Sequence, residues 1–585
     1  MCGIAGAFAY GANAPALREA ELRAMRDAMA LRGPDGTGEY FSIDGRLALG
    51  HRRLAIVDLR SVADQPMRLA GSGLHIVFNG EIFNYQALRD ELTAQGAVFE
   101  TASDTEVLLH LYARDGVAML GRLRGMFAFA IHDAAKGEMF LARDAFGIKP
   151  LYIADDGGTL RFASQVKALL ASDRVDRRPN PAGHAGFFLW GHVPDPHTLY
   201  RGISALPAGH FAIVDARGMR KPAPFFDLCA ALSARGAPAM DLRAAVVDTV
   251  RHHMIADVPV GVFLSAGIDS TVLAGIAAET NASQLDTVTL GFDTFRGSAN
   301  DETALAEEFA AARGTRQHTV WIDRAHFSAA RDALFAAMDQ PTVDGINTYF
   351  VAEAAKQVGL KVALSGLGGD EIFAGYPSFA QIPKLVRQAA PFGFMGPAVR
   401  LATQDWIGRI ASPKYAGLLE YGGTFEGAYL LRRALYMPWE IAKLLPRGMA
   451  EEGLAELGYP DTLDRGLGAA SSDRLKVSAL EIANYMRDRL LRDSDWAGMA
   501  HSVEIRVPFV DPVFLANALP HLAHAGKRDL AATPKPPLPD ALRDRPKTGF
   551  VVPVREWLVG AGDRHGHLRG LRGWANHVYS TFVDA

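Results

Sequence analysis

The strongest constraint on the fold is a change of pattern along the chain. Up to residue 215, short β-type runs alternate with turn residues, and few helical stretches intervene. The runs are residues 4–10, 47–58, 74–79, 126–132, 139–143, 151–154 and 210–214. One stretch, 104–115, has its apolar residues on a single helical face. Residues 1–215 are therefore predicted to form an α+β domain built on antiparallel sheets.

A different pattern follows a segment rich in Arg, Gly, Pro and Ala, residues 216–240, which we interpret as a linker. Residues 258–264 are continuously apolar, as expected of a strand that is buried on both faces. Helical and strand-like stretches then alternate at 270–279, 287–292, 301–313 and 360–365. This alternation predicts a parallel α/β sheet in a second domain, residues 241–585, with helical additions over about 379–474.

Composition narrows the class of protein. The 585 residues carry 61 Lys+Arg and 65 Asp+Glu, a net charge of −4 that favours neither nucleic acid nor an anionic membrane as a partner. No apolar run reaches the roughly 18 residues of a membrane span, and no basic region precedes the first apolar stretch as in a signal peptide. The two cysteines, Cys2 and Cys229, are too few for a disulfide framework or a cysteine zinc site. These features predict a cytoplasmic protein.

Cys2 has a chemical option that an internal cysteine lacks. Removal of Met1 would leave a free α-amino group beside the thiol, with a pKa of about 8. That amine can act, directly or through water, as the base that activates the thiol. Taken alone, a cysteine at position 2 is more often inert.

Three further features suit the amide of a free amino acid. The planar fork of Arg53 fits a carboxylate, and Asp104 could hold an ammonium group. Asn79 and Gly80 end a β-type run with a side-chain amide and a glycine N–H, the two kinds of donor that an oxyanion hole needs. The alternative is that Arg53 and Asp104 are surface ion-pair residues and that Asn79-Gly80 is a hairpin turn.

Several motifs of this half resemble the glutaminase domain of class II glutamine amidotransferases. They are Cys2-Gly3-Ile4, Arg32-Gly33-Pro34-Asp35, Asn79-Gly80-Glu81, Ser103-Asp104-Thr105-Glu106, 125–129, Arg143-Asp144 and 147–152. The resemblance implies an N-terminal nucleophile hydrolase sandwich (αββα) in which Cys2 attacks glutamine and Asn79 and Gly80 form the oxyanion hole. It also implies a glutamine-binding set comprising Arg53, Leu54, Ala55, Ile56, Val57, Asn79, Gly80, Glu81 and Asp104.

The second half has a phosphate-loop pattern that is not a Walker loop. Residues 264–270 follow a buried strand and open a helix, so that small residues such as Gly267 let backbone N–H groups approach a phosphate. Asp269 in such a loop is explained by Mg²⁺ bridging to pyrophosphate. A second cluster, 365–371, ends another predicted parallel strand, so Asp370 could hold the same metal. The alternative for each cluster is an ordinary turn.

Residues 240–560 resemble the synthetase domain of glutamine-hydrolysing asparagine synthetases, a PP-loop ATP pyrophosphatase fold. The motifs that carry the resemblance are 265–270, 365–376, 493–511 and Lys547-Thr548-Gly549-Phe550. Such enzymes adenylate a carboxylate with ATP, release pyrophosphate and let ammonia attack the acyl-adenylate; the resemblance also implies a homodimer. It assigns ATP contacts to Phe263, Ser265, Gly267, Asp269, Ser270, Leu290, Ser365 and Gly366, metal binding to Asp269 and Asp370, and an adenylating role to Lys527. The alternative for Lys527 is a solvated lysine.

Two positions depart from the family pattern. Ala266 stands where the family usually has glycine, which would be costly at a positive φ. Leu367 stands where well-studied asparagine synthetases have a glutamate, and a leucine can neither bind an ammonium nor move a proton. Glu371 or Glu504 could compensate.

The resemblance to asparagine synthetases makes aspartate the first expected acceptor. Another carboxylate, such as a uronic acid or a secondary-metabolite or polysaccharide intermediate, is the alternative. A glutamine-independent amide or lactam ligase and a catalytically silent scaffold protein are further readings. The intact set of Cys2, Arg53, Asn79 and Asp104 argues against the ligase. A silent scaffold predicts gaps among the motif residues, and only Ala266 and Leu367 hint at any.

Overall fold

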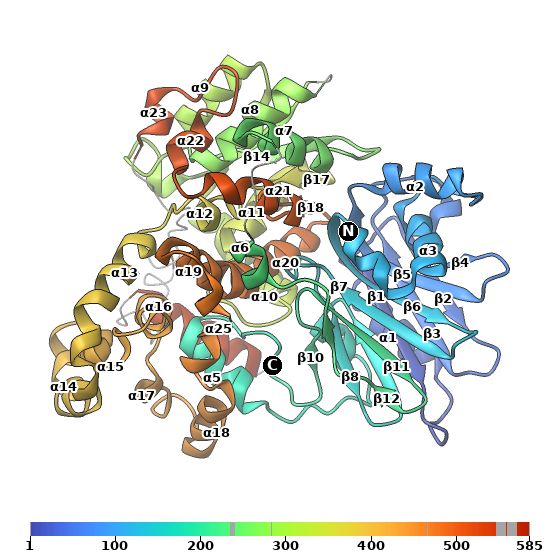
Figure 1. The fold of residues 1–585 in the computed structure, drawn as a ribbon, viewed down its shortest axis with the longest axis horizontal. Coiled ribbons are helices and arrows are strands. Elements are labelled where there is room, and N and C mark those ends of the chain that lie inside the picture. The colour runs from blue at the N-terminus through green and yellow to red at the C-terminus, as the bar shows by residue number, and fades with distance from the viewer. Residues whose placement is uncertain are drawn as a thin grey trace.

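The computed structural model describes residues 2–234, 240–281, 284–464, 466–545, 557 and 570–583. In Figure 1 the amino-terminal half lies to the right and the carboxyl-terminal half above and to the left. The predicted motif 547–550 lies outside the described residues. None of the helices in the described ranges is long and apolar enough to cross a membrane.

Two antiparallel sheets form the amino-terminal half. The first has the order β10 (Ser204–Ala205), β8 (Tyr152–Asp155), β9 (Thr159–Ala163), β1 (Gly3–Ala9), β3 (Leu47–Arg53), β2 (Gly36–Phe41). The second has the order β12 (Gly218–Met219), β11 (His210–Asp215), β7 (Glu138–Arg143), β6 (Gly125–Asp133), β5 (Leu74–Ile82), β4 (Met67–Leu69), and β13 (Ala223–Pro224) also pairs with β11. The sheet thus continues to Pro224, into the segment interpreted from the sequence as a linker.

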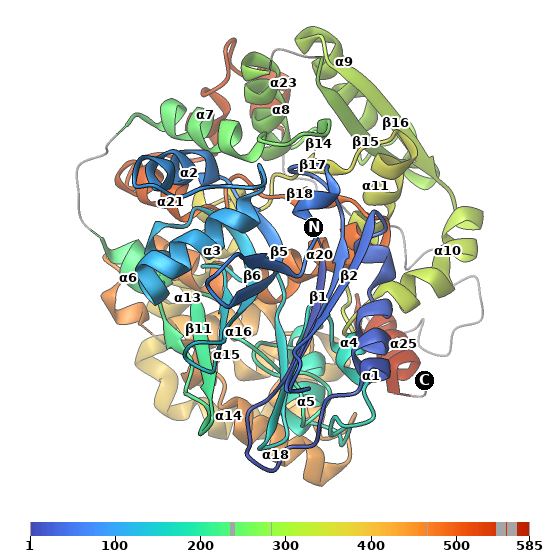
Figure 2. The ribbon, with the colours of Figure 1, turned by 90° about the vertical axis from the view of Figure 1, so that its right-hand side faces the viewer.

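Helices cover the outer faces of both sheets. Ile4 and Leu49 of the first sheet share a buried cluster with Val77 and Leu141 of the second, so the two sheets face each other. Helices α1 (Glu19–Asp27) and α4 (Val166–Leu170) pack on the outside of the first sheet. Helices α2 (Tyr85–Ala94) and α3 (Asp104–Asp115) cover the second, as Figure 2 shows for α3 beside β5. The predicted αββα sandwich is confirmed.

Helix α3 illustrates how local sequence sets these elements. The Ser103 side chain caps its first turn by accepting from the Thr105 N–H. At the other end Gly116 has a φ of +57°, which ends the helix in a conformation that favours glycine. The helix spans the residues that the apolar face predicted.

The carboxyl-terminal half contains a five-stranded parallel sheet, as predicted. Its order is β16 (Arg316–Ile322), β15 (Asp286–Phe292), β14 (Val260–Phe263), β17 (Val362–Leu364), β18 (Glu504–Arg506). Strand β16 was not foreseen, because its first four residues are polar and only its last three are apolar, so it forms no continuous apolar run. The helices around this sheet are α7 (Leu242–His253), α8 (Ile268–Thr280), α9 (Thr303–Arg313), α10 (Arg324–Ala337), α11 (Ile346–Gln357), α12 (Gly369–Ile372), α20 (Arg492–Ala500), α21 (Pro512–Ala518), α22 (Lys527–Ala531) and α23 (Asp540–Arg543).

The remaining helices lie below the parallel sheet in Figure 1, and α13 to α15 extend farthest from the amino-terminal sandwich. They are α5 (Pro181–Trp190), α6 (Leu228–Ser233), α13 (Ser378–Ala389), α14 (Gly396–Ile410), α15 (Leu418–Tyr421), α16 (Phe425–Arg433), α17 (Pro438–Ile441), α18 (Arg447–Leu457), α19 (Asp473–Leu480), the π-helix η9 (Glu481–Leu491) and α25 (Arg572–Val583). The expected helical region at about 379–474 is thus present. Helix α5 belongs to the first half of the chain but packs against α18.

Candidate active sites

Cys2 lies immediately before β1 and is 8% exposed. Its main-chain nitrogen, the atom that becomes the α-amine once Met1 is removed, donates to Asn79 Oδ1 at 2.8 Å. Its Sγ lies 3.9 Å from the Leu54 carbonyl oxygen. Burial raises the pKa of the thiol, so the free thiolate is disfavoured until a base is at hand.

Asn79 and Gly80 stand on β5 beside this cysteine. Because Asn79 Oδ1 accepts from Cys2, the amide nitrogen Nδ2 is left as a donor, and it is buried without a hydrogen-bond partner among the described residues. An unsatisfied buried donor costs free energy unless a ligand uses it. Gly80 has a φ of +154°, and a Cβ there would lie 2.1 Å from the Met126 carbonyl oxygen. No other residue fits this position.

Arg53 ends β3 next to the cysteine, and its side chain is held by the loop that follows. Its guanidinium donates to the Arg60 carbonyl at 2.9 Å and to Asp64 Oδ1 at 2.7 Å, and also to the Asp58 carbonyl. Arg53 does form an ion pair, as the alternative expects, with an aspartate that is 49% exposed, but the Arg53 side chain itself is only 9% exposed and is not a surface residue.

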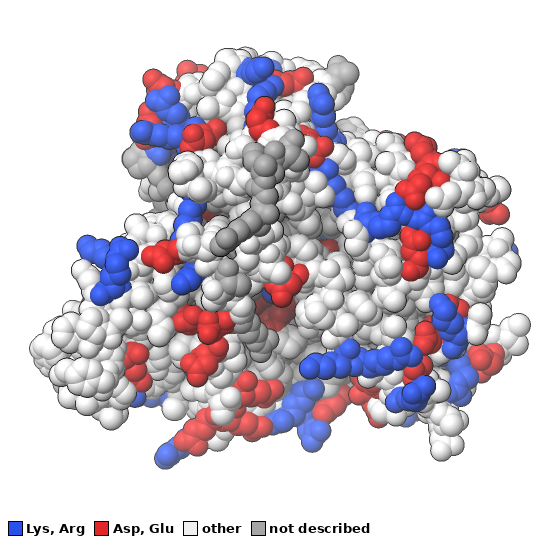
Figure 3. Space-filling view, viewed as in Figure 1, with Lys and Arg blue, Asp and Glu red and all other residues white. Residues whose placement is uncertain are grey.

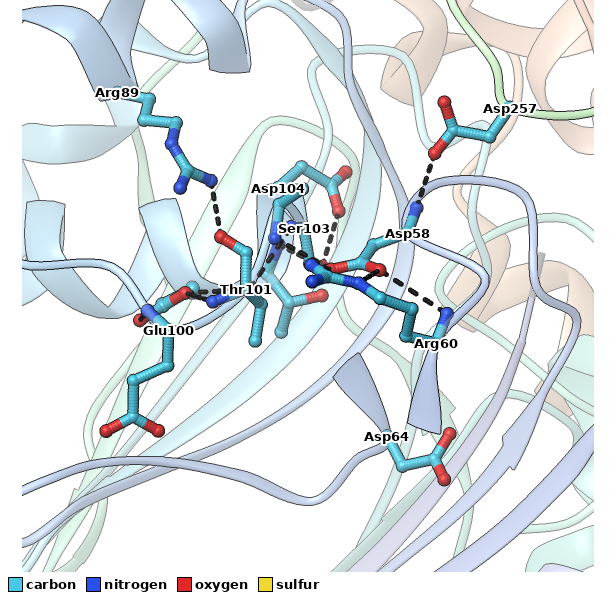
Figure 4. Close-up of polar contacts among 12 residues, drawn as sticks. Asp58, Arg60, Asp64, Arg89, Glu100, Thr101, Ser103, Asp104 and Asp257 are labelled. Atoms are coloured by element: carbon cyan, nitrogen blue, oxygen red, sulfur yellow. Dashed lines mark hydrogen bonds and ion pairs between the residues drawn. The ribbon is translucent and has the colours of Figure 1, made fainter. Parts of the chain in front are cut away.

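The same loop is tied to its surroundings through Asp58, at the centre of Figure 4. The Asp58 carboxylate accepts from the Ala102 N–H at 2.7 Å and from two nitrogens of Arg60 at 2.6 Å. The Asp58 N–H donates to Asp257 of the carboxyl-terminal half at 2.8 Å. The loop beside the cysteine is therefore anchored to the start of α3 and to the other half of the chain.

Asp104 opens α3 and is buried. Its Oδ2 accepts from the Ile82 N–H at 2.9 Å, beside the Asn79-Gly80 pair on the same strand. Burial raises its pKa to about 6, and the nearby charge of Glu504 adds to the rise, although hydrogen bonds from Ile82 and Ser103 oppose it. A buried carboxylate in this state is suited to an incoming ammonium group.

Arg32, Asp495 and Arg506 have no role predicted from the sequence, yet they form ion pairs close to Cys2. Arg32 Nε donates to the Cys2 carbonyl at 3.0 Å, and its other nitrogens form a bidentate pair with Asp495 of α20 at 2.6 and 3.1 Å. Arg506 of β18 is fully buried, pairs with Glu504 at 2.7 Å and lies 3.7 Å from Glu81. These contacts join the amino-terminal site to the parallel sheet, and no pattern within one segment could have revealed them.

The second site begins at the carboxyl end of β14. Ser265 and Ser270 face each other with their hydroxyl oxygens 2.9 Å apart, and the Gly267 N–H donates to Ser265 Oγ at 3.2 Å. Gly267 is the N-cap of α8. Ala266 is not among the described residues with a positive φ, so its methyl group carries no backbone strain. This loop can present N–H groups and hydroxyls to a phosphate.

Side chains from three segments meet beside that loop: Asp269 of α8, Asp370 of α12 and Lys527 of α22. Lys527, the first residue of α22, lies 2.8 Å from Asp370 Oδ1 and 2.6 Å from Asp269 Oδ2. Burial alone would lower the pKa of the lysine, but the two carboxylates raise it above its usual value. Lys527 is therefore a charged residue of this site, and the alternative of a solvated lysine is wrong.

The loop after β17 can approach the loop after β14 only because it contains glycines. A Cβ at Gly366 would lie 2.8 Å from the Asp269 Cβ, and one at Gly369 would lie 2.4 Å from Asp269 Oδ1. Ser365 is held in place by its N–H bond to the Arg506 carbonyl at 2.8 Å. The predicted nucleotide contacts Phe263 and Leu290 lie on the neighbouring strands β14 and β15.

The two candidate substitutes for a glutamate at position 367 lie in different places. Glu371 is buried on α12 next to Asp370, and burial raises its pKa to about 7 while Tyr376 donates to it at 2.8 Å. Glu504 pairs with Val362, at the opposite end of β17 from Leu367, and faces Arg506. Only Glu371 is positioned near Leu367.

The residues present fit a magnesium ion only with help from a substrate. Within the described part of the chain no group of three or more His, Cys, Asp or Glu side chains could hold a metal. Asp269 and Asp370 supply two carboxylates, and Mg²⁺ is commonly held by one or two carboxylates together with substrate phosphates and water. The pair therefore fits a metal that arrives with ATP.

Comparisons with known proteins agree with this geometry. A glutamine amidotransferase domain profile matches residues 1–226, and an asparagine synthase profile matches residues 241–573. Asparagine synthetase (glutamine-hydrolyzing) 1 of Bacillus subtilis is 32% identical over 573 residues, 95% of this chain and 88% of its own. A Mycobacterium tuberculosis relative whose name assigns it provisionally to the same enzymes is 34% identical, with the same shares covered. A Gibberella zeae protein named amidase chry2 is 31% identical over 96% of this chain and 89% of its own.

Fold, sites and similarity together define a glutamine-dependent carbon–nitrogen ligase, an enzyme that uses ATP and takes its nitrogen from glutamine. The chain belongs to the glutamine-hydrolysing asparagine synthetase family. It carries out amidation of the asparagine-synthase type.

Proposed function

We propose that Cys2 hydrolyses glutamine and that the released ammonia reaches an acyl-adenylate at the second site. The Asn79 amide nitrogen, buried beside Cys2 without a partner among the described residues, carries the first half of the proposal. With Gly80 it would hold the tetrahedral oxyanion. Arg53 and the residues after it would hold the glutamine carboxylate, and Asp104 would hold the amine.

At the second site we propose that a carboxylate displaces pyrophosphate from ATP and forms an acyl-adenylate. A carboxylate oxygen attacks the α-phosphorus of ATP, the bond to the β-phosphate breaks, and pyrophosphate leaves. Ammonia then attacks the acyl carbon, and AMP and a proton leave as the amide forms. Mg²⁺ would neutralise charge on the phosphates between Asp269 and Asp370.

Lys527 is the residue that fits the adenylation step. Its ammonium group already bridges Asp269 and Asp370. It can stabilise the charge of the pentacovalent phosphorus in a site with little water. Ser265, Gly267 and Ser270 would hold the departing pyrophosphate through their hydroxyls and N–H groups.

We propose aspartate as the acceptor, with a different carboxylate as the second candidate. Leu367 favours the second candidate, because it removes a carboxylate from the loop where an α-amine would be bound. Glu371 favours aspartate, since it is buried beside the loop and could take over that contact. The similarity to a protein named as an amidase fits either acceptor.

The experiment is a pyrophosphate-release assay with glutamine or ammonium chloride and with aspartate or other carboxylates. Aspartate-dependent pyrophosphate and AMP in a 1:1 ratio with amide would support the full proposal. Release that requires another carboxylate would overturn aspartate and keep the two-site mechanism. Cys2→Ala should abolish glutamine-supported synthesis and spare ammonium-supported synthesis; loss of both would contradict separate sites.

A further inference from the structure

Exposed apolar side chains are concentrated at the tip of a helical lobe, defined as residues 378–446. Seven large hydrophobic side chains with high exposure fall within 24 residues, on η5 (Ala390–Met395), α14, and η6 (Pro413–Gly417). They are Phe392, Phe394, Met395, Leu401, Trp406, Ile410 and Tyr415. Phe394 is 83% exposed and Trp406 is 62% exposed, and such a grouping of exposed apolar side chains is typical of an interaction site.

The remainder of the described surface differs in kind. Its other exposed large hydrophobic residues are leucine, isoleucine or valine, distributed singly over both halves of the chain. Isolated apolar residues of this kind are normal and need no partner. All four aromatic members of the exposed set lie on the lobe. Trp and Tyr favour the boundary between water and lipid, and Phe is common on the apolar face of helices that lie in that boundary.

The position of the lobe leaves this surface accessible. In Figure 1, α14 and α15 form the end of the molecule farthest from the amino-terminal sandwich. In Figure 3 the same end shows few charged side chains over its tip, with Lys and Arg gathered above it on the side of α13. Segments η5, α14, η6 and α15 pack on one another, so the tip is a built unit.

The charge of the lobe is opposite to that of the whole chain. Residues 378–446 contain eight Lys or Arg and four Asp or Glu, a formal charge of +4, whereas the complete chain has −4. Lys384 and Arg387 on α13 are exposed, as is Lys443. Arg387 and Lys443 each lie 3.9 Å from an aspartate, Asp473 and Asp405, in pairs whose side chains are all more than half exposed. The overall balance, which predicted no membrane partner, therefore hides a local excess of positive charge.

We propose that the tip of this lobe docks on a bilayer surface that contains anionic phospholipids. The aromatic and aliphatic side chains would enter the headgroup region, and the basic side chains would face lipid phosphates, the combination typical of peripheral membrane binding. A second copy of the chain fits less well, because two lobes of charge +4 would repel each other when paired face to face. This inference concerns a surface remote from both active sites and does not depend on the acceptor.

The test is flotation of the purified full-length protein with phosphatidylglycerol-containing vesicles and with pure phosphatidylcholine vesicles. We expect binding to the anionic vesicles that weakens as salt increases, since basic residues contribute through a screened attraction. Phe394→Ser/Trp406→Ser should weaken that binding by at least about tenfold, because two rings no longer enter the interface. The matched control, Ile43→Ser/Val98→Ser, replaces side chains that are as exposed but lie on the other half.

A charge variant separates the two contributions. Lys384→Glu/Arg387→Glu should reduce binding to anionic vesicles and leave the weak binding to phosphatidylcholine unchanged. A melting temperature and a rate of ATP-dependent amide synthesis equal to wild type show that each variant is folded. No flotation of the wild type, or equal flotation of the aromatic variant and its control, would overturn the proposal. So would sedimentation showing self-association that the aromatic variant abolishes, with no vesicle binding, since the surface would then serve a second copy.

Discussion

The two active sites differ in how their polar groups are satisfied. Two groups near Cys2 are not fully satisfied: the Asn79 amide nitrogen has no partner within the described chain, and burial raises the pKa of Asp104 to about 6. At the second site Lys527 already satisfies Asp269 and Asp370. A preformed site can receive its ligand without rearrangement, whereas the second must exchange its own ion pairs for those of ATP and metal.

The largest effect is expected from Asp269→Asn. The change removes one of two carboxylates for the metal and one partner of Lys527, so ATP-dependent amide synthesis should fall by about 10³-fold. Glutaminase activity should remain within about threefold, because the site at Cys2 stays intact. Pyrophosphate and glutamate are measured in parallel, with Asp293→Asn as an exposed control. Equal losses in both assays would show that the sites are not separable in this way.

The converse variant is Asn79→Ala. Loss of the waiting amide donor should lower kcat for glutamine hydrolysis by about 10²- to 10³-fold, the effect of removing one oxyanion donor. Synthesis from ammonium chloride should be unaffected. A normal kcat with a raised KM would mean that Asn79 only binds glutamine.

The pH dependence of glutamine binding tests Asp104. Its pKa is raised to about 6, so the carboxylate is anionic above pH 6 and becomes neutral as the pH falls below that value. Since an ammonium ligand needs the anion, KM for glutamine should rise about tenfold for each pH unit below 6. Asp104→Asn should show a high KM at every pH, without the rise below pH 6.

The matched control for this profile is Asp90→Asn, which alters an exposed carboxylate on α2. It should retain the wild-type dependence on pH. If KM for glutamine still rises below pH 6 in Asp104→Asn, the titrating group is not Asp104.

The smallest of the four effects concerns the contact between the two halves. Asp495→Ala leaves Arg32 buried and unpaired, which should lower the free energy of unfolding by about 3–5 kcal/mol and reduce glutaminase kcat about tenfold as Cys2 loses its fixed position. The amount of glutamate formed per amide should rise above that of wild type. Asp332→Ala, at an exposed aspartate, should change neither quantity. If the melting temperature and the ratio of glutamate to amide both stay unaltered, the Arg32–Asp495 pair does not link the two halves in the way proposed.

Local patterns carried most of the fold. The β-type runs became strands of the two sheets, and helix α3 lies where its apolar face placed it. The loops at Asn79-Gly80 and at residues 264–270 could be predicted as site loops because each is a contiguous motif at the end of a strand. The sequence did not show that Arg32 reaches Asp495 or that Arg506 lies beside Glu81, since those residues are far apart in the chain and meet only after the halves pack. The positive charge of residues 378–446 was also missed, because the net charge of the whole chain is −4.

The route of nitrogen is the most direct test of two linked sites. Wild-type enzyme is supplied with amide-¹⁵N glutamine, ATP, magnesium, the acceptor and an excess of unlabelled ammonium, and the amide product is analysed by mass spectrometry. Transfer within the protein predicts that the product retains ¹⁵N well above the isotope ratio of the surrounding ammonia. A product that matches the ratio in solution would contradict it, because ammonia released at Cys2 would then have mixed with bulk before reaching Asp269 and Lys527.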